Sequence, residues 1–272
     1  MKTASVWDVI SVMEKLAPPE LAEQWDNPGL QVGDDRRQVR NIWVALDASP
    51  PVVDAACCEG IDMLITHHPL LIRPVKSIDV QTPFGKIVQK ALRHNLAVFS
   101  AHTNLDAVSG GINDMLARRL ELQDIDCFSP ASEPNRGVSH FGIGRIGNLR
   151  APMTLIELSK FVKLRTGPPH LKIVGHHGLT VCRVAVCSGS GSGIMADFFA
   201  SDAHVLISGD VKYHDARDAE SLNRALIDIG HFASEHLMLD VLAQRVQQEC
   251  DLLGYELRVQ ACRLEKDPFA IV

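Results

Sequence analysis

The strongest constraint on the fold is a repeated alternation of short apolar runs with helix-like segments. The run NIWVALDA (41–48) precedes a segment that starts near Ser49 and ends at Gly60, and DMLIT (62–66) precedes a second segment that starts near Thr82. A third run, LAVFSAH (96–102), follows. Apolar runs of this length between such helices are typical of parallel strands joined by crossover helices. The sequence therefore predicts an α/β fold with mostly parallel sheets.

Helix boundaries carry local signals that support this assignment. Ser49 and Thr82 each stand directly before a proline, which is the pattern of an N-cap followed by proline in the first helical turn. Near the N-terminus, apolar residues at positions 6, 9, 10, 13 and 16 share one helical face, and Pro18-Pro19 end that segment.

The second half of the chain repeats the pattern of the first. VALDASPPVVDAACCEGIDMLITHH (44–68) can be aligned with VAVCSGSGSGIMADFFASDAHVLISGD (184–210), and LRHNLAVFSAHTNLD (92–106) with LNRALIDIGHFASE (222–235). In this alignment His102 corresponds to His231, and Asp106 to Glu235. We therefore expect two related α/β lobes, 1–125 and 126–272, which can pack as one compact unit. The polar segment 121–137 is expected to be a linker or crossover.

Composition excludes several classes of protein. The net charge of −6 argues against a dedicated nucleic-acid-binding protein, which usually carries a basic stripe. No run approaches 18 apolar residues, so no membrane span is expected, and the N-terminus lacks the apolar core of a signal peptide. The seven cysteines form no C-x-x-C pair, which favours reduced thiols in a cytoplasmic protein over cysteine ligation of zinc.

Imidazoles and carboxylates follow three of the predicted strands. They occur in LITHHPLL (64–71), FSAHTNLD (99–106) and DIGHFASE (228–235). The carboxyl ends of parallel strands meet at one edge of a sheet, so these side chains can converge. His231 and Glu235 are four residues apart and would share a helical face. Taken singly, each motif is also compatible with a histidine-rich turn or an ordinary polar helix start.

Such a donor set has a clear chemical use. Mixed nitrogen and oxygen ligands suit zinc, iron, manganese or nickel better than calcium or magnesium. Two divalent ions about 3.5–4 Å apart can lower the pKa of a bound water and clamp an attacked oxygen. The residues therefore favour hydrolytic chemistry at a dinuclear centre.

These motifs resemble those of a known family. Together with WDNPGLQVGD (25–34), RVAVCSGSGS (183–192) and LISGDVKYHDA (206–216), they resemble the Nif-three-like family of GTP cyclohydrolase 1 type 2 homologues, in the same order and over nearly the whole chain. The sequence looks like the short form, because no additional domain fits between the halves. The resemblance implies a ring-shaped homohexamer whose sites face an internal cavity. It also implies two divalent ions per chain, with Glu235 bridging them and five ligands in all: His67, His68, Asp106, His231 and Glu235.

Other residues are candidates for contact with substrate. The internal alignment would make His102 a metal ligand, whereas the ligand set implied by the resemblance omits it, and we expect it to orient water or substrate. Lys212 and His214 could contact substrate or move protons, or belong to a polar loop that caps the next helix. CSGSGSG (187–193) is either a tight turn or an anion contact. WDNPGL (25–30) is expected to be structural, and His176-His177 to form a hairpin turn.

The resulting functional prediction is a metal-dependent hydrolase acting on a nucleotide or another anionic small molecule. The family label points to a purine nucleotide such as GTP. The alternative is a non-catalytic metal-binding or macromolecular interaction module that uses a ring-shaped oligomer. Nucleic acid is the less favoured partner, and its binding would show a steep salt dependence.

Overall fold

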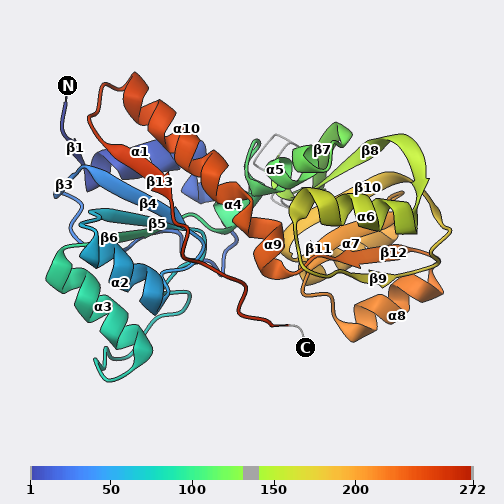
Figure 1. Ribbon diagram of the computed structural model, residues 1–272, viewed down its shortest axis with the longest axis horizontal. Helices are drawn as coiled ribbons and strands as arrows, with labels where there is room; N and C mark the ends of the chain where they lie inside the picture. The colour runs from blue at the N-terminus through green and yellow to red at the C-terminus, as the bar shows by residue number, and fades with distance from the viewer. Residues whose placement is uncertain (1, 131–140, 271–272) are drawn as a thin grey trace. The chain divides into compact units, whose positions relative to one another are not determined.

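A computed structural model describes residues 2–130 and 141–270. The chain divides into two compact units (Figure 1). Unit 1 comprises Met1–Leu105 and Met238–Lys266, and unit 2 comprises Asp106–Leu237 and the end of the chain from Asp267. No helix in the described part of the chain is long and apolar enough to cross a lipid bilayer.

Unit 1 is built on a mostly parallel sheet. Its strands lie in the order β13-β4-β5-β6-β2, in which β13, β4, β5 and β6 are parallel and the edge strand β2 is antiparallel to β6. Helices α2 and α3 cover one face, and α1 and α10 lie on the other (Figure 1). The elements are β1 (Ala4–Ser5), α1 (Val6–Leu16), η1 (Pro19–Leu21), β2 (Gly29–Val32), β3 (Gln38–Val39), β4 (Asn41–Ala45), α2 (Pro50–Cys58), β5 (Met63–Thr66), α3 (Pro83–His94), β6 (Ala97–Ser100), α4 (Thr103–Ala107, which crosses into unit 2), α10 (Met238–Leu252) and β13 (Arg258–Ala261).

Local sequence explains where these helices begin and end. Ser5 caps α1 in a reciprocal box with Asp8, which satisfies donors that the first helical turn would otherwise leave open. Thr82 caps α3 by accepting from the Gly85 N–H, Pro83 occupies the first turn, and Asn95 ends the helix in the left-handed conformation. The helix starts predicted at Ser49 and Thr82 are confirmed.

Unit 2 has a mixed sheet with a parallel centre. The order is β7-β8-β10-β11-β12-β9, in which β10, β11 and β12 are parallel and the remaining pairs are antiparallel. Alternate residues of β10 enter two apolar clusters, with Val184 and Val186 in one and Ala185 and Cys187 in the other. The elements are α5 (Ile112–Arg119), β7 (Gln123–Pro130), β8 (Gly142–Thr154), α6 (Leu155–Thr166), β9 (Lys172–Val174), β10 (Thr180–Ser190), η2 (Gly191–Ile194), α7 (Met195–Ala200), β11 (Val205–Gly209), α8 (Tyr213–Ser221), β12 (Ala225–Asp228) and α9 (His231–His236).

The two units share one connectivity. In unit 1, a helix, an antiparallel edge strand and three parallel strands follow as α1-β2-β4-β5-β6, and in unit 2 they follow as α6-β9-β10-β11-β12. Helices α2 and α3 correspond to α7 and α8, and α4 corresponds to α9. The predicted α/β class, with two related lobes and parallel central strands, is therefore confirmed.

The unit boundaries differ from the expected division at residue 125. Residues 106–125 belong to unit 2, where α5 packs against β8 and β10. The C-terminal segment 238–266 returns to unit 1, because β13 pairs with β4 and α10 packs on both strands. A strand pairing more than 200 residues apart leaves no trace in local periodicity.

Two loop assignments are corrected. Part of the expected linker 121–137 is the edge strand β7, where proline is tolerated at the strand end, and residues 131–137 lie outside the described ones. His176-His177 do not form a hairpin, because β9 pairs with β12 and not with β10.

Candidate metal centre

Unit 1 brings three imidazoles together at one sheet edge. His67 and His68 directly follow β5, and His102 follows β6 after one residue; the two strands are parallel neighbours, so their carboxyl ends meet. One ring nitrogen from each of the three lies within 4.8 Å of the others. The ring centroid of His67 is 5.0 Å from that of His68 and 5.1 Å from that of His102. This group can hold a metal ion.

In each of these imidazoles, Nδ1 lies within hydrogen-bond distance of an oxygen acceptor. His67 Nδ1 is 3.0 Å from the Ala101 carbonyl oxygen, and His68 Nδ1 is 3.0 Å from Asp47 Oδ1. His102 Nδ1 is 2.8 Å from Asp26 Oδ1. A carbonyl or an ionised carboxylate can only accept, so Nδ1 carries the proton and, in the neutral ring, Nε2 keeps the lone pair that a cation needs.

The buried carboxylate of Asp26 is a site residue that the sequence analysis missed. Its side chain is inaccessible to solvent and accepts from His102 Nδ1 and from the N–H and hydroxyl of Thr103. Burial alone would raise the pKa of Asp26, but these hydrogen bonds outweigh it and hold the pKa at about 2. WDNPGL is thus more than a turn. Asp26 precedes His102 by 76 residues, and no local signal connects them.

Replacement of Asp26 by asparagine is expected to change acid stability. In the native protein, the carboxylate contributes about 2 kcal/mol at neutral pH, since its pKa of about 2 lies below the ordinary value of 3.8. That contribution is complete above about pH 4 and is lost as the pH falls through 2. Asp26→Asn should therefore be less stable at pH 7, and the two denaturant unfolding curves should converge by pH 2.

A second variant provides the control for acid stability. Asp47 makes the same contact to His68, but its carboxylate is 54% exposed, so Asp47→Asn should have a smaller effect. A constant difference between Asp26→Asn and the native protein from pH 7 to pH 2 would contradict the assignment.

In unit 2, His231 and Glu235 lie on the short helix α9, which follows β12. His231 Nδ1 is 2.8 Å from Asp210 Oδ2, and His231 Nε2 is 3.1 Å from Glu235 Oε2. If Nδ1 donates to Asp210, a neutral His231 presents a lone pair toward a carboxylate oxygen. Two acceptors at this distance need a proton or a cation beside them, which fits a metal-binding pair.

Asp106 occupies the same unit. Its Oδ1 is 3.1 Å from Ser188 Oγ, which donates, and its backbone carbonyl accepts from Asn113 Nδ2 at 3.1 Å. Burial, and then the negative charges of Asp106 and Glu235, raise the pKa of the Cys187 thiol well above its ordinary value. Both carboxylates therefore act on one buried region of unit 2. A divalent ion would relieve this concentration of negative charge.

A glycine makes room for Glu235. Gly189 has φ +61°, and a Cβ added there would lie 2.3 Å from Glu235 Oε1. The CSGSGSG segment forms the strand end and the tight η2 turn, and its first glycine clears space for a carboxylate. From the sequence, this segment was expected to be a tight turn or an anion contact, and neither expectation includes this steric role.

The loop after β11 contributes Asp210 in addition to the residues expected from the sequence. Lys212 and His214 lie at the start of α8 and are both exposed. Asp210 of the same loop has a left-handed backbone conformation, with φ +52°. Its carboxylate contacts His231 Nδ1 and so orients that ring. Substrate contact by Lys212 and His214 stays a prediction, and the contact to His231 comes from Asp210.

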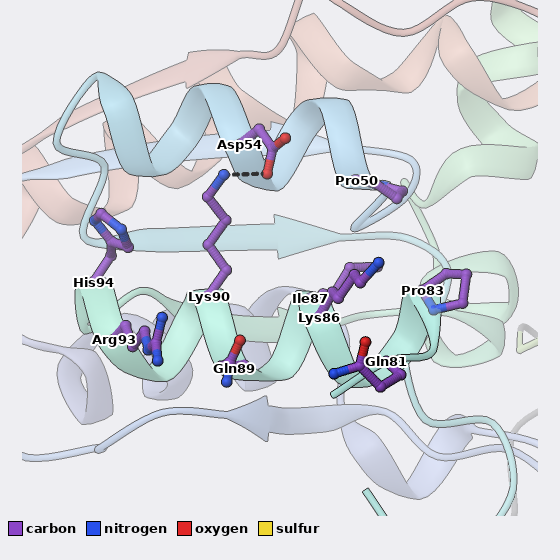
Figure 2. A pocket seen from close by; sticks show the side chains of 10 residues that line it. All are labelled: Pro50, Asp54, Gln81, Pro83, Lys86, Ile87, Gln89, Lys90, Arg93 and His94. Atoms are coloured by element: carbon purple, nitrogen blue, oxygen red, sulfur yellow. Dashed lines mark hydrogen bonds and ion pairs between the residues drawn. The ribbon is translucent and has the colours of Figure 1, made fainter. Parts of the chain in front are cut away.

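A separate hollow lies between α2 and α3 of unit 1. It has a volume of about 530 Å³, and Figure 2 shows Lys90 extending from α3 to Asp54 on α2. Its cationic side is formed by residues of α3, including Lys86 and Arg93. None of the five expected metal ligands lines this hollow. The imidazoles at the sheet edge are the better candidate site.

Comparison with known proteins finds relatives that align with nearly the whole chain. Two curated relatives described as GTP cyclohydrolase 1 type 2 homolog are 32% identical (Clostridium perfringens, 97% of this chain and 98% of the relative) and 34% identical (Clostridium acetobutylicum, 97% of each). A Bacillus cereus protein related to NIF3 superposes with a TM-score of 0.94 at 25% identity over 100% of both chains. Reduced HcgD from Methanocaldococcus jannaschii superposes at 0.81 and 27% identity over 97% of this chain and 100% of that one.

The family assignment rests on a match that covers nearly the whole chain. Residues 4–268 match the profile described as Duf34/NIF3 (NGG1p interacting factor 3). The resemblance identified from the strand-end motifs is therefore confirmed, and the chain belongs to the Duf34/NIF3 family.

Proposed function

We propose that this protein is a metal-dependent hydrolase with a dinuclear centre that acts on a nucleotide or another anionic small molecule. The observation that carries the proposal is the orientation of the imidazoles. His67, His68 and His231 each place Nδ1 against an oxygen acceptor, so in the neutral ring Nε2 carries the lone pair that a cation needs. The proposed ligands are the five that the family resemblance implies: His67, His68, Asp106, His231 and Glu235.

The donor set fits divalent transition metals. Neutral imidazole nitrogens with carboxylate oxygens suit zinc, iron, manganese or nickel. Two such ions would supply a water of lowered pKa and positive charge toward an anionic substrate. With Asp106 and Glu235 as the anionic ligands, four positive charges would be only half neutralised.

His102 and Asp26 are suited to proton transfer. The ionised Asp26 holds the His102 ring by Nδ1 and stabilises a positive charge on it, so Nε2 can take up and release a proton. Trp25 packs edge-on against the same ring, with centroids 5.8 Å apart. In this proposal His102 moves protons, and the exposed Lys212 and His214 contact substrate.

Metal analysis tests the proposed ligand set. Protein reconstituted with zinc or manganese and desalted should contain about two ions per chain, and alanine at any of the five ligands should remove one or both. His177→Ala is the matched control, because His177 lies exposed in a turn. Full metal content in His67→Ala and Glu235→Ala would exclude this centre.

A substrate screen tests the reaction. The metallated protein should hydrolyse at least one member of a panel of purine nucleotides, including GTP, and phosphoesters. His102→Ala should retain its metal and lose turnover. Complete inactivity of the metallated protein over this panel would favour a non-catalytic metal-binding or interaction module.

We also propose that the chain assembles as a homohexameric ring in the cytoplasm. The support is the family resemblance. Light scattering coupled to size exclusion should give a mass close to six times 29.8 kDa, and a monomer at micromolar concentration would contradict the ring.

A further inference from the structure

We propose that Arg145 is a positioning residue that fixes Asp106 for metal binding by clamping the two carbonyls that follow it in the chain. This inference rests on the proposed function, since it takes Asp106 to be a ligand. It assigns a role to a buried cation that the sequence analysis did not consider.

Arg145 is buried and fully engaged. It is 2% exposed, and its Nη2 donates to the carbonyl oxygens of Ala107 (3.2 Å) and Val108 (2.9 Å). Its Nη1 donates to the carbonyls of Gly142 and Gly144, at 2.8 and 2.7 Å. A planar guanidinium can bind four carbonyls at fixed angles, whereas an ammonium cannot reproduce that fork.

A buried acid completes the clamp. Arg145 Nε donates to Asp114 Oδ2 at 2.8 Å, and Asp114 is 9% exposed. The same Oδ2 accepts from the Gly110 N–H at 3.1 Å. The Arg145–Asp114 pair therefore ties down both ends of the segment 107–110, which starts one residue after Asp106.

Other groups hold Asp106 itself: Asn113 donates to its carbonyl and Ser188 to its carboxylate. The two carbonyls that follow are held by Arg145, and the Val108 carbonyl also accepts from the Gly111 N–H at 3.0 Å. Asp106 is the fourth residue of the five-residue helix α4, which is too short to be rigid by itself. Metal–oxygen bonds tolerate displacements of about 0.2 Å, so loss of the clamp should weaken binding.

Substitution by lysine, with a matched control, separates positioning from general stability. Arg145→Lys keeps the charge and loses the fork. Arg224→Lys is the control, because Arg224 also donates to two carbonyls of unit 2, those of Ser201 and Ala203. Affinity for zinc and manganese is measured by competition with a chromophoric chelator, and stability by denaturant unfolding of the chelated protein.

Both variants should lose stability, but only Arg145→Lys should lose metal affinity, by about 10- to 100-fold at one of the two ions. Equal affinity in Arg145→Lys and Arg224→Lys would overturn the proposal. If Arg145→Lys does not fold, Asp114→Asn provides the test. It removes the anion that anchors Arg145 Nε, and affinity should fall at least threefold; unchanged affinity would overturn the proposal.

Asp106→Ala distinguishes the two failures. If Asp106→Ala loses a metal ion while Arg145→Lys and Asp114→Asn bind as the native protein does, only the clamp is wrong. If Asp106→Ala also binds normally, the proposed ligand set itself fails.

Discussion

Replacement of Glu235 by glutamine is expected to stabilise the metal-free protein and to abolish its stabilisation by metal. Glu235 is 3% exposed, and its charge acts, together with that of Asp106, on the buried Cys187. Desolvation of a buried ionised carboxylate costs several kcal/mol, and the like charge of Asp106 adds to that cost; the neutral amide of glutamine removes both.

The expected magnitudes are measurable by thermal denaturation. In a chelator, Glu235→Gln should gain about 1–2 kcal/mol, or roughly 2–8 °C in Tm. Free metal at a thousand times Kd should stabilise the native protein by about 4 kcal/mol, and the variant should lose most of this gain. Glu220→Gln is a control on the exposed surface of the same unit. A Glu235→Gln variant that is less stable in chelator and still stabilised by metal would contradict the role of Glu235 as a ligand.

Replacement of Gly189 by alanine is expected to disrupt the metal centre through one methyl group. The new Cβ would lie 2.3 Å from Glu235 Oε1 and 3.4 Å from His231 Cε1, so the carboxylate must move. The left-handed backbone adds about 1–2 kcal/mol of strain. Metal affinity should fall at least tenfold, measured by chelator competition.

Gly167→Ala separates backbone strain from displacement of the ligand. Gly167 also has a positive φ, +76°, but a Cβ there meets nothing within 4 Å. This variant should lose comparable backbone stability and keep its metal affinity. If both glycine variants bind metal as the native protein does, Glu235 is not held in place by the space at Gly189.

Local sequence patterns predicted the elements that carry the candidate site. The alternation of strands and helices, the caps at Ser49 and Thr82, and the position of His67-His68 after a strand all follow from periodicity and turn chemistry within about 20 residues. The internal alignment of His102 with His231 places both residues two or three positions beyond the ends of equivalent strands, β6 and β12. These features depend on short-range interactions, which the order of residues encodes directly.

Tertiary structure decided which groups support the imidazoles. Asp26 holds His102 from 76 residues away, and Asp47 contacts His68 from a neighbouring strand end. Asp210 lies in the same loop as Lys212 and His214, but no local pattern in the sequence indicates that its carboxylate contacts His231. Gly189 and Arg145 likewise act on residues about 40 positions away.

Tertiary structure also decided that residues 238–266 belong to unit 1, where β13 pairs with β4. The partner of a strand or a buried side chain is chosen by the whole chain, because every pairing must bury apolar surface and satisfy each polar group at once. Local periodicity contains the pattern of each element but not the identity of its distant neighbour. For this protein, the sequence by itself determined the fold class and the strand ends that carry the imidazoles, whereas the contacts that orient them exist only in the folded chain.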